Sequence, residues 1–296
     1  MRPRSRFRRR IMNYLMSAFT GLTIVVILIP LGSILYTAIV NGGAAVISPG
    51  FFTESPGLPC SSSSGQTCHL GGVAPAISGT LVLISLAALI AVPIGVSAAI
   101  YVVEFGRNRP LGRFISSVAD VLSGVPSIVA GAFVYALFYA YAPAIAFSAL
   151  SGALALSVLM IPVVARTSEE ALRTVPNAMR EAAVALGIAK WKSTLRIVLV
   201  TALPGVVTGV LLSVARAAGE AAPLLLTAFG NPHGFQGLNL PVEAMPLQIF
   251  VFATSPFANW KELAWGMALV LILLVLGMSV VSRLVIQRLA ARLQGG

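Results

Sequence analysis

Charged side chains are scarce in this 296-residue sequence, and their scarcity limits the class of protein it can be. Only 10% of the residues are Asp, Glu, Lys or Arg, whereas 57% are hydrophobic. The mean hydropathy is +0.93. Soluble domains carry about 25% charged residues, so this chain has too few to cover its apolar surface in water. The composition therefore predicts an integral membrane protein.

Residue types that carry out catalysis are scarce as well. The sequence has two histidines, His69 and His233, and each falls in a predicted loop. We find no Gly-rich phosphate loop followed by Lys-Ser/Thr and no nucleophile with a base in a familiar spacing. The sequence predicts a non-catalytic chain that binds no metal ion and no cofactor of its own.

The only two cysteines, Cys60 and Cys68, lie in a segment rich in Gly, Ser and Pro. Their spacing matches no common zinc pattern. An exported loop would permit a disulfide between them. The residues alone leave two alternatives open, a Cys60–Cys68 disulfide or two free thiols.

Long apolar runs with few or no charges are abundant by contrast. Six of them are long enough to cross a membrane, which takes about 20 helical residues: 14–40, 77–103, 114–140, 144–165, 198–229 and 263–286. We predict an all-α integral membrane protein with six transmembrane helices in a single domain, 14–287. The run 244–253 is too short to cross, and we expect a surface or re-entrant helix there.

The basic residues predict how the chain is oriented. All but two of the 20 Lys and Arg residues lie in the N-terminal tail, in 104–113, in 166–196 or after Ser282. Six spans place these segments on one face, which the positive-inside rule makes cytoplasmic. We therefore predict a multi-pass protein of the cell membrane (inner or plasma membrane) with both termini cytoplasmic. Its tails are 1–13 and 288–296, and its external loops are 41–76 and 230–262.

This topology also accounts for most of the net charge of +11. A nucleic-acid partner is therefore not expected, because arginines ahead of a first span are an ordinary topology signal.

The cytoplasmic segment 166–197 is longer and more polar than a turn between two spans needs to be. Pro176 and Asn177 favour a helix start, and Gly187 favours its end. This helix has a mostly apolar face, made of Ala178, Ala182, Leu186 and Ile188. Such a helix can lie on the membrane or dock into a groove of a partner protein, and the residues alone do not choose between them.

One charged pair, Arg216 and Glu220, interrupts the fifth apolar run in the stretch VARAAGEAAP. An arginine at the centre of a membrane helix costs about 2.5 to 3.5 kcal/mol, so it normally faces protein or water and is paired. The i, i+4 spacing lets the two side chains meet. A guanidinium also suits the oxygens of an anion such as phosphate. The pair is therefore either a contact for a transported anion or a structural ion pair, unless Arg216 extends to the membrane interface.

Two further charged residues lie near the ends of predicted spans. Arg166, at the end of the fourth span, is a second candidate for an anion contact, with a topology charge as the alternative. Asp120 precedes Gly124 and Pro126, which can bend the third span. We expect Asp120 to make a polar contact near a helix end, because a carboxylate would repel an anion.

The 166–197 segment resembles the cytoplasmic loop of the membrane subunits of ATP-binding-cassette importers. The matching residues are Glu181, Ala182 and Ala183, followed by Gly187 and then Ile197. The family usually continues with Leu-Pro, where this chain has Leu199 and Val200. The resemblance implies the architecture of a type I importer permease, with a coupling helix that docks into an ATPase subunit.

Other stretches resemble a narrower family, the A-type permeases of phosphate uptake systems. They are 93–105, 122–131, 163–192, 215–229 and 240–260. The resemblance implies a subunit of an ATP-driven inorganic phosphate importer, with translocation residues Arg216, Glu220 and Arg166. It also implies these partners: a second, related permease in a heterodimer, an ATP-binding subunit dimer that carries ATP and Mg, and an extracytoplasmic phosphate-binding protein. A permease for another oxyanion, such as sulfate or molybdate, and a stand-alone secondary anion transporter are the alternatives.

Overall fold

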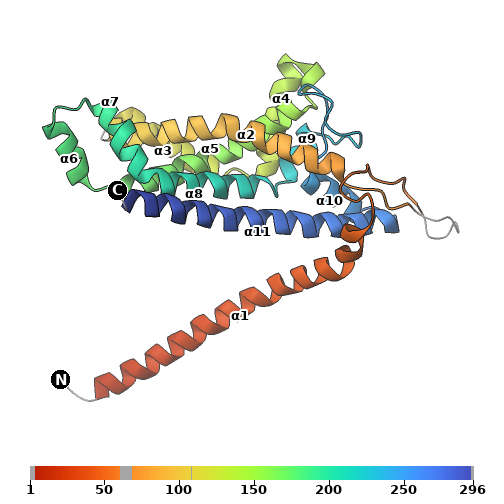
Figure 1. Ribbon diagram of the computed structural model, residues 1–296, viewed down its shortest axis with the longest axis horizontal. Helices are drawn as coiled ribbons and strands as arrows, with labels where there is room; N and C mark the ends of the chain where they lie inside the picture. The colour runs from red at the N-terminus through yellow and green to blue at the C-terminus, as the bar shows by residue number, and fades with distance from the viewer. Residues whose placement is uncertain (1–3, 61–68, 108, 295–296) are drawn as a thin grey trace.

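The chain folds into helices joined by loops, and a computed structural model describes residues 4–60, 69–107 and 109–294 (Figure 1). Within those ranges the only β-structure is two isolated bridges, Pro56 with Gly71 and Phe229 with Val242. The predicted all-α class is confirmed. The elements are α1 (Arg4–Ile47), α2 (Ala74–Ile100), η2 (Tyr101–Phe105), α3 (Pro110–Ser123), α4 (Ser127–Tyr141), η3 (Pro143–Ile145), α5 (Ala149–Arg173), α6 (Asn177–Ala185), α7 (Lys190–Ser193), η4 (Thr194–Val198), α8 (Leu199–Ala217), α9 (Ala222–Thr227), α10 (Met245–Ala253) and α11 (Ala258–Gln294).

Five helices of the described chain are long and apolar enough to cross a membrane: α1, α2 with η2, α5, α8 with the short elements before it, and α11. The third predicted span differs from the prediction. It is divided into α3 and α4, whose axes differ by 107°. The described chain thus has five candidate spans, or six if this bent pair counts as one.

The break between α3 and α4 has a local cause. Gly124 follows α3, and Pro126 immediately precedes α4. Glycine is a poor helix former, and proline has no N–H to donate to the preceding turn. Proline also disfavours helical backbone at the residue before it, here Val125. A continuous helix across 123–127 is therefore disfavoured.

Helix α5 is the centre of the bundle and packs between α2 and α8 (Figure 1). The core around it is rich in alanine, and Ala87 and Ala91 of α2 belong to the same buried cluster as Ala149 and Ala153 of α5. Small residues let membrane helices approach closely, which matters because lipid supplies no hydrophobic force between helices. Gly209 of α8 shows the same packing, because a Cβ there would collide with Thr167.

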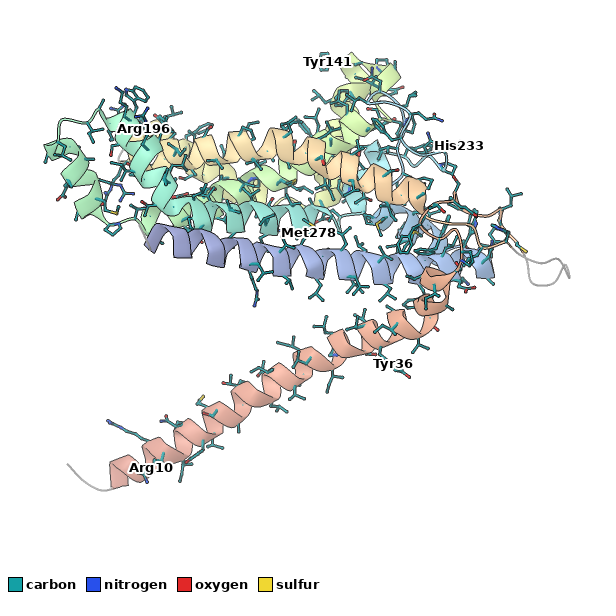
Figure 2. The ribbon with its side chains drawn as sticks, viewed as in Figure 1. Arg10, Tyr36, Tyr141, Arg196, His233 and Met278 are labelled. Atoms are coloured by element: carbon teal, nitrogen blue, oxygen red, sulfur yellow. The ribbon has the colours of Figure 1, made fainter. Side chains whose placement is uncertain are left out.

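Helix α1 stands apart from this bundle. The C-terminal end of α1 contacts α11 through a stripe of small residues, Ala38, Gly42 and Ala45. Residues 8–36 are all exposed, and Figure 2 shows the side chains from Arg10 to Tyr36 pointing into open space. Most of this apolar helix is therefore uncovered within the chain.

The bundle has two distinct ends, which Arg196 and His233 mark in Figure 2. We call them the α6 end, which holds η2, the start of α3, α6 and α7, and the α9 end, which holds α9, α10 and the loops around them. Helix α10 lies where a surface or re-entrant helix was expected in 244–253. It is buried against α2 and α11, and the Met245 amide donates to the Thr80 hydroxyl at 2.8 Å.

Candidate functional site

The fifth predicted span is interrupted at the residues that carry the charged pair. Helix α8 ends at Ala217, and α9 begins at Ala222. Gly219 is a poor helix former, and Pro223 has no N–H for the carbonyl of Gly219. The helix is therefore broken here, and Arg216 lies in the last turn of α8. A helix C-terminus favours a cation, because the last carbonyls carry partial negative charge.

The Arg216 guanidinium is only loosely held. Its Nε lies 3.7 Å from Oε1 of Glu220, which is too long for a hydrogen bond. The Arg216 side chain is 63% exposed. No hydrogen bond from this side chain to any described residue is recorded. The predicted i, i+4 contact with Glu220 is thus present, but it leaves the donors of the guanidinium available.

Arg166 is held far more firmly. One terminal nitrogen donates to Oε2 of Glu169 at 2.8 Å, and the other donates to the carbonyl of Ser116 at 2.7 Å and pairs with Asp120. Because Ser116 and Asp120 belong to α3, Arg166 ties α3 to α5. Glu169 also accepts from Arg173 at 2.7 Å. The polar contact predicted for Asp120 is confirmed, and its partner is Arg166.

The two arginines reach the same side of α5. Arg216 and Glu220 share a small hollow with Leu159 and Val163 of α5. Leu159, Val163 and Arg166 follow each other at helical spacing and so lie on one face. Arg166 is three residues from Val163, about 4.5 Å along the axis. The structure therefore brings a loosely held and a firmly held guanidinium to one face of the central helix.

Helix α6 matches the helix predicted in the 166–197 segment. Gly187 has φ of +74°, a left-handed conformation that glycine adopts without a Cβ penalty. The amide of Ile188 then donates to the carbonyl of Ala183 at 3.1 Å, which closes the end of the helix. Ala183 is buried, whereas Glu181 and Ala182 are exposed.

The apolar face predicted for α6 is open to solvent. Leu186 is 79% exposed, and Ala178 and Ala182 are also exposed. Val184 of the same helix is exposed as well. Exposed apolar side chains on a short helix are typical of a surface that contacts another protein or a membrane.

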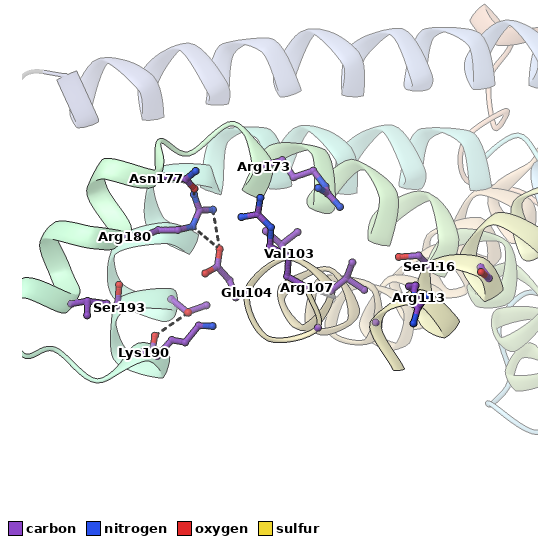
Figure 3. Close-up of a pocket in the computed structure, with 16 residues that line it drawn as sticks. Val103, Glu104, Arg107, Arg113, Ser116, Arg173, Asn177, Arg180, Lys190 and Ser193 are labelled. Carbon is purple, nitrogen blue, oxygen red and sulfur yellow. Dashed lines mark hydrogen bonds and ion pairs between the residues drawn. The ribbon is translucent and has the colours of Figure 1, made fainter. Parts of the chain in front are cut away.

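Sequence reasoning missed the contact that holds α6 in place. Nε of Arg180 in α6 donates to Oε1 of Glu104 in η2 at 2.9 Å (Figure 3). A terminal nitrogen of Arg180 donates to the carbonyl of Leu172 at 2.8 Å. Glu104 is buried. The two residues are 76 positions apart, so no local spacing points to the pair. The ion pair fixes α6 against the end of α2.

Comparisons with known proteins identify the family. Residues 91–295 match the family described as binding-protein-dependent transport system inner membrane component. A phosphate transport system permease protein PstA of Xylella fastidiosa is 42% identical over 74% of this chain and 76% of its own length. PstA 1 of Mycobacterium tuberculosis is 42% identical over 90% of this chain and 86% of its own. PstA of Haemophilus influenzae is 38% identical over 94% and 95%. The chain belongs to this permease family.

Solved structures support the fold of the permease. An inward-facing structure of the methionine ABC transporter MetNI superposes with a TM-score of 0.59 at 16% identity, covering 73% of the permease and 96% of that chain. An amino acid ABC transporter superposes with a TM-score of 0.51 at 17% identity. At these identities the likeness shows the fold alone. The permease is a multi-pass inner membrane component, as predicted, and its family is not one of enzymes.

The α9 end of the permease holds an apolar cavity of about 560 Å³ whose lining includes Phe229, Glu243, Gln248 and Trp260. Burial raises the pKa of Glu243 from 4.5 to about 7, although the backbone amide of Ala244 donates to this carboxyl and opposes the change. Sequence reasoning did not single out Glu243. Its neighbours Val242, Ala244 and Met245 are apolar and buried, and a single carboxylate among apolar residues is the signal that could have indicated its burial.

Two sequence predictions concern metal and thiol chemistry. Among the described residues of the permease, no group of three or more His, Cys, Asp or Glu side chains could hold a metal ion. Cys60 lies beside α11, where its amide donates to the Asn259 side chain at 3.3 Å. Cys68 lies outside the described residues, so the disulfide stays a prediction.

Proposed function

We propose that this chain is the membrane subunit of an ATP-driven inorganic phosphate importer and forms half of its translocation pathway. The substrate is suggested by relatives that are phosphate transport system permeases and are about 40% identical over most of the chain. The observation that carries a role for a specific residue is the exposed Arg216 guanidinium at the break between α8 and α9.

Arg216 is suited to contact an anion that must also leave. A guanidinium presents planar donors that match phosphate oxygens in pairs. Glu220, 3.7 Å away, occupies the guanidinium when no phosphate is present. The negative charge of Glu220 also lowers the affinity of Arg216 for an anion, so that the anion can be released.

Arg166 takes a different part in this proposal. Both terminal nitrogens of its guanidinium are already engaged by carboxylates and a carbonyl. The sequence suggested Arg166 as a second anion contact, and we propose instead that it is a positioning residue. It holds α3 against the face of α5 on which Arg216 lies.

The family of the chain and its exposed surfaces support the remaining partners. We place the α6 end and both termini in the cytoplasm, where α6 docks into an ATPase subunit dimer that holds ATP and Mg. Glu181, Ala182, Ala183 and Gly187 are the coupling residues. The open side of α1 fits lipid and a second, related permease subunit. An extracytoplasmic phosphate-binding protein delivers the ion at the α9 end.

Reconstitution tests the proposal. The chain, its partner permease and the ATPase are placed in liposomes, and uptake of labelled phosphate is measured with ATP and with the binding protein. We expect phosphate uptake to require ATP. We also expect sulfate and molybdate to be poor competitors for this uptake. Preference for another oxyanion would refute the substrate, and uptake without ATP would favour a secondary transporter.

The role of Arg216 needs its own variants in the same liposomes. Arg216→Gln and Arg216→Lys are compared with the original chain at matched amounts of assembled complex. Original rates of uptake in both variants would refute the anion contact and leave the importer assignment intact.

A further inference from the structure

A cavity of about 960 Å³ lies at the α6 end rather than beside Arg216 (Figure 3). Segments from five parts of the chain line it: η2, the start of α3, the end of α5, α6 and α7 with η4. This volume lies in the range of small-molecule sites, which run from about 300 to 1,000 Å³. None of the residues proposed above as translocation contacts lines it.

The lining of this cavity is strongly basic. Its charged members are Glu104 and five cations: Arg107, Arg113, Arg173, Arg180 and Lys190. Arg180 is paired with Glu104, and Arg173 is paired with Glu169. For the other three cations no carboxylate partner is recorded within the described ranges. A concave surface with an excess of one charge concentrates counter-ions of the opposite sign.

The uncharged lining residues fit the same kind of ligand. They supply hydroxyl and amide donors, from Ser116, Ser117, Asn177, Ser193 and Thr194. The Lys190 ammonium lies 5.2 Å from the centre of the Phe105 ring, which holds the lysine beside η2. Oxygen-rich anions accept several hydrogen bonds at once, and phosphate groups bind where arginines and hydroxyls converge.

The cavity also touches the segments that set the position of α6. Asn177, Arg180 and Val184 of α6 form one wall. The opposite walls come from η2 and η4, both of which are π-helical. Such segments are rare and are frequently found at functional sites. A ligand in this cavity would therefore contact both α6 and the ends of the helices that carry it.

We propose that the basic lining of this cavity, in which Arg107, Arg113 and Lys190 are the cations without a carboxylate partner among the described residues, binds a phosphate group and thereby holds α6 against η2. The group belongs either to inorganic phosphate from the aqueous phase or to the headgroup of an anionic phospholipid. This inference does not depend on the transport function proposed above, because it uses neither Arg216 nor movement of the ion through the membrane.

A binding experiment on the full chain tests the proposal. The chain is placed in nanodiscs of phosphatidylcholine, and binding of labelled inorganic phosphate is measured for the original chain and for Arg107→Gln/Arg113→Gln. The matched control is Arg109→Gln/Arg196→Gln, which removes two charges from the same end but from outside the cavity lining. We expect the cavity variant to bind at least about tenfold more weakly and the control to bind within about twofold of the original.

A second arm identifies the source of the phosphate group. Nanodiscs that contain phosphatidylglycerol are analysed by native mass spectrometry for lipid that stays on the chain. If the cavity variant loses binding of inorganic phosphate and the control variant keeps it, the ligand is the free ion. If the original chain retains phosphatidylglycerol but binds no inorganic phosphate, and the cavity variant alone loses the lipid, the ligand is the headgroup.

Three results would overturn the inference. One is binding of neither ligand by the original chain, and another is an equal loss in the cavity variant and the control. The third is phosphate binding that disappears in Arg216→Gln but persists in the cavity variant, because that result places the ion at α8. Hydrogen exchange of residues 177–186 supplies a further readout, and we expect bound ligand to slow it.

Discussion

Arg166 and Arg216 both carry a guanidinium to the same side of α5, and their partners differ in number and kind. Arg166 contacts two carboxylates and a backbone carbonyl, and 30% of its side chain is exposed. Arg216 has one carboxylate at 3.7 Å, and 63% of its side chain is exposed. An arginine whose two terminal nitrogens are both engaged holds helices together, whereas one with free terminal nitrogens can bind an ion.

The difference arises from where each residue lies on its helix. Arg166 is inside α5, with Glu169 one turn away and α3 packed alongside. Arg216 is at the end of α8, where the helix breaks before Pro223. No further turn of α8 therefore follows Arg216 to pack beside its side chain. Local breaks in the helices therefore decide which arginine stays available.

The largest expected effect comes from removing the free guanidinium. Arg216→Gln should lower phosphate uptake by at least about 100-fold, because bidentate, charge-assisted hydrogen bonds to the ion are lost. The free energy of unfolding should change by no more than about 0.5 kcal/mol, because the pair with Glu220 is exposed and long. Uptake in proteoliposomes and urea unfolding would be measured on the same preparations. Arg196→Gln, at an exposed arginine of η4, is the control.

Glu243 extends the comparison to a buried charge without a cation beside it. Burial raises its pKa from 4.5 to about 7, so between these values the folded chain keeps a proton that the unfolded chain releases. The free energy of unfolding should therefore fall as pH rises from 4.5 to 7, by about 3 kcal/mol in total. Glu243→Gln should abolish this fall and be more stable than the original chain at pH 8.

Unfolding measured across this pH range checks the Glu243 prediction. Glu262→Gln provides the matched control, because Glu262 is an exposed carboxylate near the start of α11. A slope that survives in Glu243→Gln would assign the pH dependence to another group.

Removing Arg166, the firmly held arginine, should show the opposite pattern from Arg216. Arg166→Gln should lower the free energy of unfolding by about 2 kcal/mol, because the buried Glu169 loses one of its two arginine partners and α3 loses its tie to α5. Uptake per correctly folded complex should fall much less than in Arg216→Gln. If Arg166→Gln is stable but loses as much uptake as Arg216→Gln, Arg166 contacts the anion after all.

These arginines also show what the sequence can and cannot predict. The bounds of α6 follow from Pro176, Asn177 and Gly187, because helix starts and stops are local signals. Gly124 and Pro126 indicated a bend, but its angle of 107° depends on what packs against α3 and α4. The pairing of Asp120 with Arg166 joins two helices, and the pairing of Glu104 with Arg180 crosses 76 positions. Such partners are fixed by packing, which spacing along the chain does not encode.

The smallest expected effect concerns Glu220, and it separates two roles for that residue. If Glu220 competes with phosphate for Arg216, then Glu220→Gln should bind phosphate several-fold more tightly and release it more slowly, since the like charge is gone. If Glu220 only orients Arg216, the variant should bind phosphate more weakly. Uptake measured over a range of phosphate concentrations distinguishes them, because the first role lowers both KM and the maximal rate. The second role raises KM. Glu220→Asp keeps the charge on a shorter side chain, so its KM should then lie between those of the original chain and Glu220→Gln.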